Sequence, residues 1–159
     1  MNRVVGVSDA AASNDMHDVL VTYSLGSCIA VSMYDPVMRI GGLLHFQLPS
    51  AAADANRGKD RPLMFGDTGM QWLLSEMVNL GAEQRRLRVV LAGGAKMLGD
   101  ENLFDIGRRN HAAIRKILWQ KGLFITAEHV GGGAPRNLRL AVEDGTVTIN
   151  CREEQIALT

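Results

Sequence analysis

Two strand-like segments on either side of a proline turn constrain the fold of this chain more than any other feature. The first, Ile29–Tyr34, is rich in β-branched and aromatic side chains, and the second, Ile40–Leu48, stops at Pro49. Asp35 and Pro36 lie between them, and proline presets the backbone for the first corner position of a turn. Segments of this composition on both sides of a turn predict a β-hairpin.

The other apolar runs predict an α+β, layered α/β sandwich in a single domain, residues 1–159, with a mixed or antiparallel sheet and two main helices. One helix is expected from about Asp67 to Gly81, and a second from about Asp105 to Gly122, because apolar residues recur there at helical spacing. These helices are too few for a doubly wound fold. Further strands are expected at the remaining apolar runs: Val4–Val7, Val19–Thr22, Leu87–Ala92, Leu123–Val130, Arg136–Val142 and Thr146–Asn150.

Two polar stretches show neither strand nor helix periodicity, and we expect both to be surface loops. The first contains Ser13, Asn14 and Asp15, between the first two predicted strands. The second spans residues 50–62, directly after the hairpin. We expect this second loop to lie near any site that the hairpin carries.

Composition and charge exclude several classes of function. Hydrophobic residues make up 47% of the chain and charged residues 21%, which is typical of a soluble globular protein. Lys plus Arg number 17 and Asp plus Glu number 17, so no overall field attracts a polyanion, and we expect no nucleic-acid ligand. No apolar run approaches the roughly 18 residues that span a membrane, and no signal peptide is evident. We therefore expect a cytoplasmic protein without membrane insertion.

Cys28 and His45 are the pair of residues best suited to chemistry, and the hairpin brings them together. A cysteine attacks a carbonyl carbon as the thiolate, and imidazole can take its proton near neutral pH. Facing residues of an antiparallel hairpin have numbers with a constant sum, and a two-residue corner pairs Asp35 with Met38, a sum of 73. Cys28 and His45 have the same sum, so this register places them opposite one another on one face. A shift of one residue would separate them.

The backbone before Cys28 is also suited to catalysis. Gly26 and Ser27 permit a tight, exposed turn whose amides can bind a substrate oxyanion. A second interpretation stays open, because free cysteine is among the most buried residue types and a strand cysteine often belongs to the core. We expect no metal and no cofactor, since the remaining histidines and cysteine lack ligand-like spacing: His17, His111, His129 and Cys151. Cys151 is interpreted as structural.

Several short motifs resemble those of a known family in their order and rough spacing, over about residues 3–151. They include Val4–Val7, Leu20–Thr22, Leu25–Val31, Tyr34-Asp35, Gly41–Leu43, His45, Gly93–Ala95, Met97, Ile106-Gly107, Arg109-Asn110, Gly131-Gly132 and Arg136. Together they resemble the CheD family, the chemoreceptor glutamine deamidases of bacterial chemotaxis.

The resemblance implies a catalytic set in which Cys28 is the nucleophile, His45 its proton-transfer partner and Thr22 the third member. It implies a layered α/β/α-type sandwich. It also implies the substrates, which are selected glutamines on the cytoplasmic helices of methyl-accepting chemotaxis receptors, converted to glutamate through a cysteine thioester. Some members of the family also hydrolyse glutamyl methyl esters. CheC, a phosphatase of the response regulator CheY, binds some members and is a further expected partner.

Two alternatives to deamidation belong to other classes of protein. A non-catalytic chemotaxis adaptor would bind receptors or CheC, but it would have no need of an intact Thr22, Cys28 and His45. A cysteine protease or transglutaminase-like enzyme would use the same thiol, and would cleave chains or incorporate amines rather than release ammonia alone. An activated Cys28 is expected to react with thiol reagents at a pH where an ordinary thiol is protonated.

Overall fold

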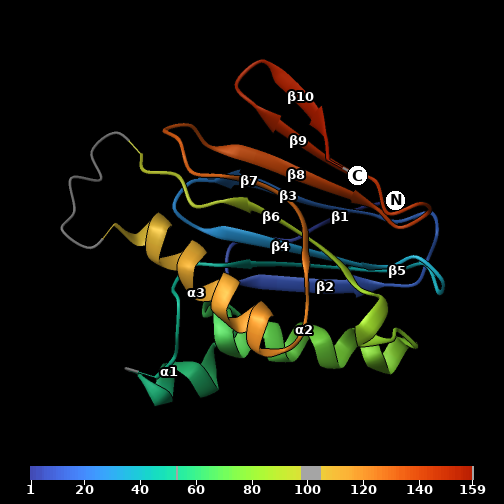
Figure 1. Ribbon diagram of the computed structural model, residues 1–159, viewed down its shortest axis with the longest axis horizontal. Coiled ribbons are helices and arrows are strands. Elements are labelled where there is room, and N and C mark those ends of the chain that lie inside the picture. Colours follow the sequence, from blue (N-terminus) through green and yellow to red (C-terminus); the bar gives the residue numbers. More distant parts are fainter. Residues whose placement is uncertain (53, 98–104, 159) are drawn as a thin grey trace.

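The structure is a computed structural model that describes residues 1–52, 54–97 and 105–158. Within these ranges, ten strands and three α-helices form one layered body (Figure 1). The strands are β1 (Asn2–Val4), β2 (Asp9–Ser13), β3 (Val19–Leu25), β4 (Ile29–Asp35), β5 (Ile40–Phe46), β6 (Arg88–Gly93), β7 (Ile125–Val130), β8 (Arg136–Ala141), β9 (Val147–Cys151) and β10 (Glu154–Ala157). The helices are α1 (Ala55–Asp60), α2 (Gly66–Leu80) and α3 (Ile106–Gln120).

The strands form two five-stranded sheets, and both sheets are mixed. The sheet that we call the helix-backed sheet has the order β2-β5-β4-β6-β7, with only β6 and β7 parallel to each other. The other, which we call the outer sheet, has the order β1-β3-β8-β9-β10, with only β1 and β3 parallel. The predicted mixed sheet and the two main helices are therefore confirmed.

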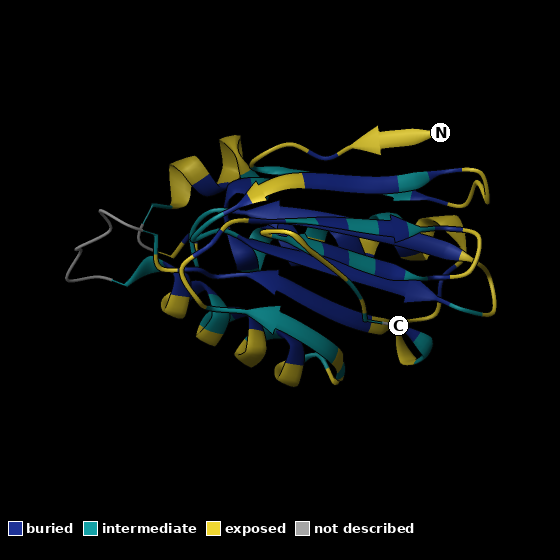
Figure 2. Ribbon diagram, turned by 90° about the horizontal axis from the view of Figure 1, so that it is seen from above, coloured by how far each residue is buried: buried dark blue, intermediate teal, exposed yellow. Residues whose placement is uncertain are grey.

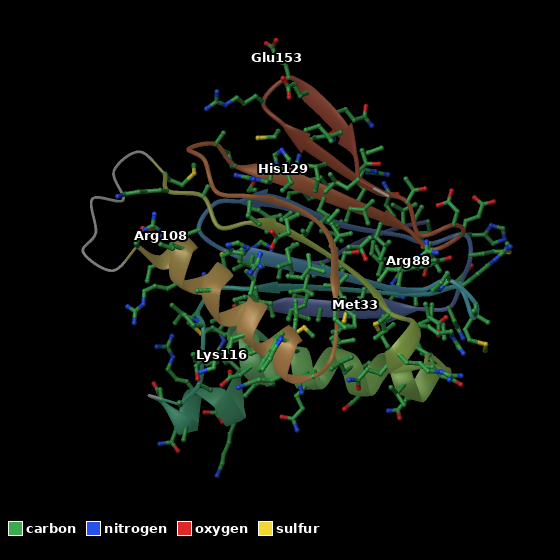
Figure 3. The ribbon with its side chains drawn as sticks, in the orientation of Figure 1. Met33, Arg88, Arg108, Lys116, His129 and Glu153 are labelled. Carbon is green, nitrogen blue, oxygen red and sulfur yellow. The ribbon has the colours of Figure 1, made fainter. Side chains whose placement is uncertain are left out.

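The layers stack in the order helices, helix-backed sheet, outer sheet (Figure 1). One core lies between the helices and the helix-backed sheet, and includes Met33 of β4 (labelled in Figure 3), Leu73 of α2 and Leu118 of α3. A second core lies between the two sheets, and includes Leu20 of β3 and Leu43 of β5. Viewed from above, the central strands are buried along most of their length, whereas β1 is exposed (Figure 2).

The α/β/α layering implied by the family resemblance is wrong for this chain. All three described helices lie on one side of the helix-backed sheet, and the outer sheet covers its other face (Figure 1). The reason is visible in β8, where buried and half-buried residues alternate along the whole strand. Such alternation is typical of an antiparallel strand with one face on a core and the other toward solvent.

None of the helices in the described ranges is long and apolar enough to cross a membrane.

The two predicted main helices begin and end close to the expected residues. Gly81, directly after α2, has φ +114°, and its N–H donates to the carbonyl oxygens of Met77 and Val78. This left-handed residue satisfies the last carbonyls of the helix and stops it. α3 begins one residue after Asp105, and Gly122 with φ +70° follows its last turn.

Both predicted loops contain regular structure that the sequence analysis missed. The first includes β2, an edge strand made mostly of alanines, which is held to β5 by backbone pairing rather than by β-branched side chains. The second includes α1, a six-residue helix whose N-cap, Asp54, accepts a hydrogen bond from Arg57 N. Neither segment has the periodicity on which the predictions depended.

The β4–β5 hairpin exists, but its predicted register is wrong by two residues. Asp35 pairs with Ile40, a sum of 75, so His45 faces Ala30 rather than Cys28. The corner is wider because the Asp35 carboxylate accepts hydrogen bonds from the N–H groups of the two residues after Pro36, at 2.9 and 3.2 Å. A shift of two residues preserves the face of every side chain. Cys28 and His45 therefore still share the side of the sheet that faces the outer sheet.

Candidate active site

The three predicted catalytic residues lie around the core between the two sheets, where Thr22 and His45 are hydrogen-bonded to each other. Thr22 lies on β3 of the outer sheet, and His45 lies on β5 of the helix-backed sheet. Cys28 lies in the short connection from β3 to β4 and packs against the same inter-sheet core. β3 has an irregularity in its pairing between Thr22 and Leu25, where Ser24 adopts φ +58°. The site therefore uses both sheets and the loop that joins them.

The hydroxyl of Thr22 fixes which ring nitrogen of His45 carries the proton. Thr22 Oγ1 lies 2.6 Å from the carbonyl oxygen of Val5 and 2.8 Å from His45 Nδ1. A carbonyl can only accept, so the single hydroxyl proton goes to Val5. Thr22 Oγ1 must then accept a hydrogen bond from Nδ1–H, which leaves Nε2 with a lone pair. The neutral imidazole is thus held in the tautomer that can act as a base through Nε2.

The surroundings of His45 keep its imidazole neutral. The side chain is 1% exposed, and burial lowers the pKa of His45 from 6.5 to about 4. The carboxylate of Asp9, which faces His45 across the β2–β5 pair, acts in the opposite direction and raises that pKa. Within the described residues, His45 Nε2 is buried and has no hydrogen-bond partner. An unpaired buried nitrogen carries a desolvation cost, and its lone pair is available to a proton donor.

Cys28 is half-buried, and its thiol is not unusually acidic. Burial raises the pKa of the Cys28 thiol, with a smaller opposing contribution from its own backbone N–H. This direction contradicts the expectation that Cys28 reacts at a pH where an ordinary thiol is protonated. A protonated thiol must lose its proton to a base before or as its sulfur attacks a carbonyl carbon. A neutral imidazole such as that of His45 is the state that can accept such a proton.

Hydrogen bonds to its carbonyl oxygens hold the backbone around Cys28 in place. Three consecutive carbonyl oxygens accept hydrogen bonds from α3 and from the two residues after β6. The bonds are Gly26 from Ala95 N (2.8 Å), Ser27 from Asn110 Nδ2 (3.0 Å) and Cys28 from Gly94 N (2.8 Å). Gly93 has φ +109°, and a Cβ atom there would lie 2.2 Å from the Cys28 carbonyl oxygen. Glycine is therefore required at this position for the close approach of the two backbones.

Asn110 is a residue of this site to which the sequence analysis assigned no role. It lies on α3, is fully buried, and also donates from Nδ2 to the carbonyl oxygen of Gln47 at 2.8 Å. A signal was present in the sequence, because Asn110 is in helical step with Ile114 and Leu118 on the buried side of α3. A polar residue at a core position of an amphipathic helix is unexpected unless its side chain has a partner.

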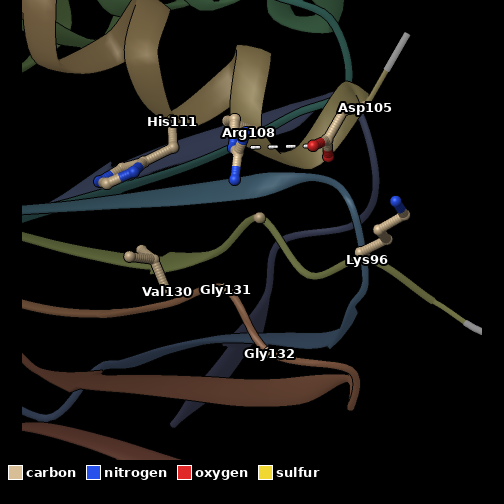
Figure 4. Close-up of a pocket in the computed structure, with 8 residues that line it drawn as sticks. Lys96, Asp105, Arg108, His111, Val130, Gly131 and Gly132 are labelled. Carbon is tan, nitrogen blue, oxygen red and sulfur yellow. Dashed lines mark ion pairs between the residues drawn. The ribbon is translucent and has the colours of Figure 1, made fainter. Parts of the chain in front are cut away.

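A hollow of about 230 Å³ lies beside Gly94 (Figure 4). Gly94, whose N–H holds the Cys28 carbonyl, contributes to its wall together with Lys96, Arg108 and Gly132. Arg108 Nε is 3.7 Å from an oxygen of Asp105, the ion pair drawn in Figure 4. Within the described ranges, no group of three or more side chains is placed to hold a metal ion.

The comparisons with known proteins agree with the resemblance noted from the motifs. A family model described as CheD chemotactic sensory transduction matches residues 47–151, more than half of the chain. The chain belongs to the CheD family. Thr22, Cys28 and His45 precede the segment matched by the CheD model.

Relatives from several organisms carry the CheD name. A protein of Solibacter usitatus named "Probable chemoreceptor glutamine deamidase CheD" is 46% identical, with 89% of this chain and 84% of the relative aligned. One from Syntrophus aciditrophicus is 42% identical, with 92% and 91% aligned. One from Thermococcus kodakarensis is 38% identical, with 92% and 91% aligned. A solved structure, NMB0706 of Neisseria meningitidis, gives a TM-score of 0.46 at 13% identity over 81% of this chain and 58% of that one, too low to bear on fold or function.

Proposed function

We propose that this chain is a chemoreceptor glutamine deamidase that hydrolyses glutamine side-chain amides of methyl-accepting chemotaxis receptors to glutamate. The receptor substrate is taken from the names of its CheD relatives. The observation that carries the chemistry is the state of His45. Its Nδ1–H donates to Thr22 Oγ1. Its Nε2, which has no partner in the part of the chain that the structure describes, lies on the sheet face that His45 shares with Cys28.

The first half of the proposed reaction forms a thioester and releases ammonia. As Cys28 Sγ attacks the carboxamide carbon of the substrate glutamine, His45 Nε2 takes the thiol proton. The carbonyl π electrons move to oxygen, and the resulting oxyanion is stabilised by backbone N–H groups of the Gly26–Cys28 loop, the predicted substrate-binding backbone at Gly26 and Ser27. The imidazolium then gives its proton to the departing nitrogen, the C–N bond breaks, and ammonia leaves.

The second half hydrolyses the thioester and restores the site. His45 Nε2 takes a proton from water as the water oxygen attacks the thioester carbon. The C–S bond breaks, the sulfur recovers a proton from the imidazolium, and the product is the glutamate side chain. Throughout both halves Thr22 keeps the ring in one orientation, the role of the third residue in other hydrolytic triads.

The same intermediate extends the proposal to a second class of substrate. A glutamyl methyl ester differs from glutamine in its leaving group, methanol instead of ammonia, and would give the identical thioester on Cys28. The proposal also places the enzyme in the cytoplasm, where receptor helices and the expected partner CheC are found. Replacing a neutral amide with a carboxylate adds one negative charge to a receptor helix, which can shift a signalling equilibrium.

Ammonia release from a purified receptor cytoplasmic fragment tests this proposal. The wild-type protein and a Cys151→Ala variant, which loses the other free thiol, should release ammonia at similar rates, whereas Cys28→Ala should release none. Circular dichroism should show that all three proteins are folded. Ammonia release by Cys28→Ala would remove Cys28 from its role. Tight receptor binding by the wild type without any ammonia release would favour the adaptor alternative.

A further inference from the structure

Among the described residues, the Ser27–Cys28 peptide group is held only through its carbonyl oxygen. The Ser27 carbonyl oxygen accepts from Asn110 Nδ2, and the chain contains no cis peptide bond within the described residues. The C=O and N–H of a trans peptide point in opposite directions. The hydrogen bond from Asn110 therefore turns the Cys28 N–H away from α3.

The Cys28 N–H is free to bind an incoming oxygen. Across the described parts of the chain, no backbone or side-chain oxygen accepts a hydrogen bond from it, although the carbonyls of Gly26, Ser27 and Cys28 are all engaged. This N–H belongs to the same residue as the thiol, so it lies close to the sulfur in the chain. A donor beside the nucleophile is where an oxyanion forms during acyl transfer.

The second hydrogen bond of Asn110 ties the same loop to the strand that carries the base. Its Nδ2 donates to the Gln47 carbonyl oxygen at 2.8 Å, two residues after His45. The two acceptors also decide the orientation of the amide, because only the nitrogen can donate to two carbonyl groups. One side chain of α3 thus links the nucleophile loop to the end of β5.

The amide oxygen of Asn110 indicates that the site uses the N–H donors of this side chain rather than its acceptor. Asn110 Oδ1 is buried and has no partner among the described residues. Leaving a buried acceptor unpaired destabilises the folded protein, and an aliphatic residue at this core position would avoid that cost. The cost is offset only by what the two donated hydrogen bonds achieve.

We propose that Asn110 is a positioning residue of the deamidase, which fixes the Ser27–Cys28 peptide so that the Cys28 N–H stabilises the oxyanion. The inference rests on the proposed function, since it concerns the same thiol. It predicts a specific defect in Asn110 variants. Steps that create an oxyanion should slow, and steps that need only a nucleophilic sulfur should not.

Two small reagents separate these steps without any receptor. The p-nitrophenyl acetate ester acylates Cys28 through a tetrahedral oxyanion, whereas iodoacetamide alkylates sulfur by direct displacement at a saturated carbon. All variants carry Cys151→Ser, so that Cys28 is the only thiol. Rates are measured against pH, and the limiting rate constant of the Cys28 thiolate is compared between each Asn110 variant and the parent. In Asn110→Asp and Asn110→Ala, acylation should fall on the order of 100-fold. Alkylation should stay within about 3-fold of the parent.

Asn137→Asp is the matched control. Asn137 uses its oxygen, accepting from Ser24 N at 2.9 Å, and a carboxylate keeps that hydrogen bond. The same chemical change near the loop should leave both reactions at parental rates. Asn110→Ala introduces no charge, and so tests the role of the donors if the buried carboxylate of Asn110→Asp prevents folding.

Three results would overturn the proposal for Asn110. These are acylation that is unchanged in a folded Asn110→Ala, acylation and alkylation that fall together, and failure of both variants to fold, which would make the amide purely structural. Failure of the proposed function looks different. In that case the parent itself would be acylated no faster than its Cys28→Ala variant, whatever residue occupies position 110.

Discussion

Burial of a neutral His45 makes the stability of this protein depend on pH in a defined range. Its pKa is about 4 in the folded protein, below the ordinary value of 6.5 that it regains on unfolding. Between these values the unfolded chain binds more protons than the folded one, so the free energy of unfolding rises with pH. The stabilisation is complete above the unfolded pKa and is lost as pH falls toward 4.

The size of this effect follows from the two pKa values. Lowering the pH from about 7.5 to about 5 should reduce the free energy of unfolding by about 2 kcal/mol through His45 alone. Asp35, whose carboxylate is paired with Arg86, does not contribute in this interval. Its pKa is lowered from 3.8 to about 2, so its stabilisation is intact above 3.8 and is lost only below that value. His129 contributes in the same direction as His45, because burial lowers its pKa too.

Urea unfolding at several pH values measures the effect, with His45→Asn compared with the wild type. Asparagine can still donate to Thr22 Oγ1 but does not titrate, so the His45→Asn variant should lose about 2 kcal/mol of the pH dependence. His129→Asn serves as the control and should keep the His45 contribution. Equal pH dependence in the wild type and His45→Asn would refute the assignment of a buried neutral imidazole.

Two further substitutions test the parts of the site that hold the reacting groups. Thr22→Val keeps the shape of the side chain but removes the acceptor for His45 Nδ1–H, so kcat for ammonia release should fall on the order of 100-fold with a loss of stability of about 2 kcal/mol. Unchanged kcat in a folded variant would show that the hydroxyl does not orient the ring. Gly93→Ala should slow deamidation, because its Cβ would push against the Cys28 carbonyl oxygen, whereas Gly131→Ala, with φ +81° and nothing within 4 Å of its Cβ, isolates backbone strain alone. Equal kcat losses in both glycine variants would contradict this account.

The sequence predicted the elements of the hairpin but not its register. A turn containing proline does not reveal how many residues occupy the corner, and the Asp35 side chain decides this by accepting hydrogen bonds from two backbone N–H groups. The error was two residues, which left Cys28 and His45 on a common face. An error of one residue would have separated them.

The periodicity of apolar residues in the sequence does not predict which residues of the two sheets contact each other. Thr22 was assigned to the site only through the family resemblance, because nothing local indicates that β3 lies over β5 and brings its hydroxyl to His45. Asn110 is different, since its place on the apolar side of α3 is visible in the sequence. The sequence does not reveal that the partners of Asn110 are backbone carbonyls from two distant segments.

The most direct test of the central claim is mass spectrometry of a receptor cytoplasmic fragment after incubation with the protein. Hydrolysis of a glutamine amide through Cys28 should add about 1 mass unit at specific glutamines, and about 3 when the reaction is run in water labelled with oxygen-18. Cys28→Ala should leave the fragment unchanged, while Cys151→Ala should modify it as the wild type does. Labelled glutamates appearing at the same rate with Cys28→Ala, or no modified glutamine with the wild type, would contradict the account.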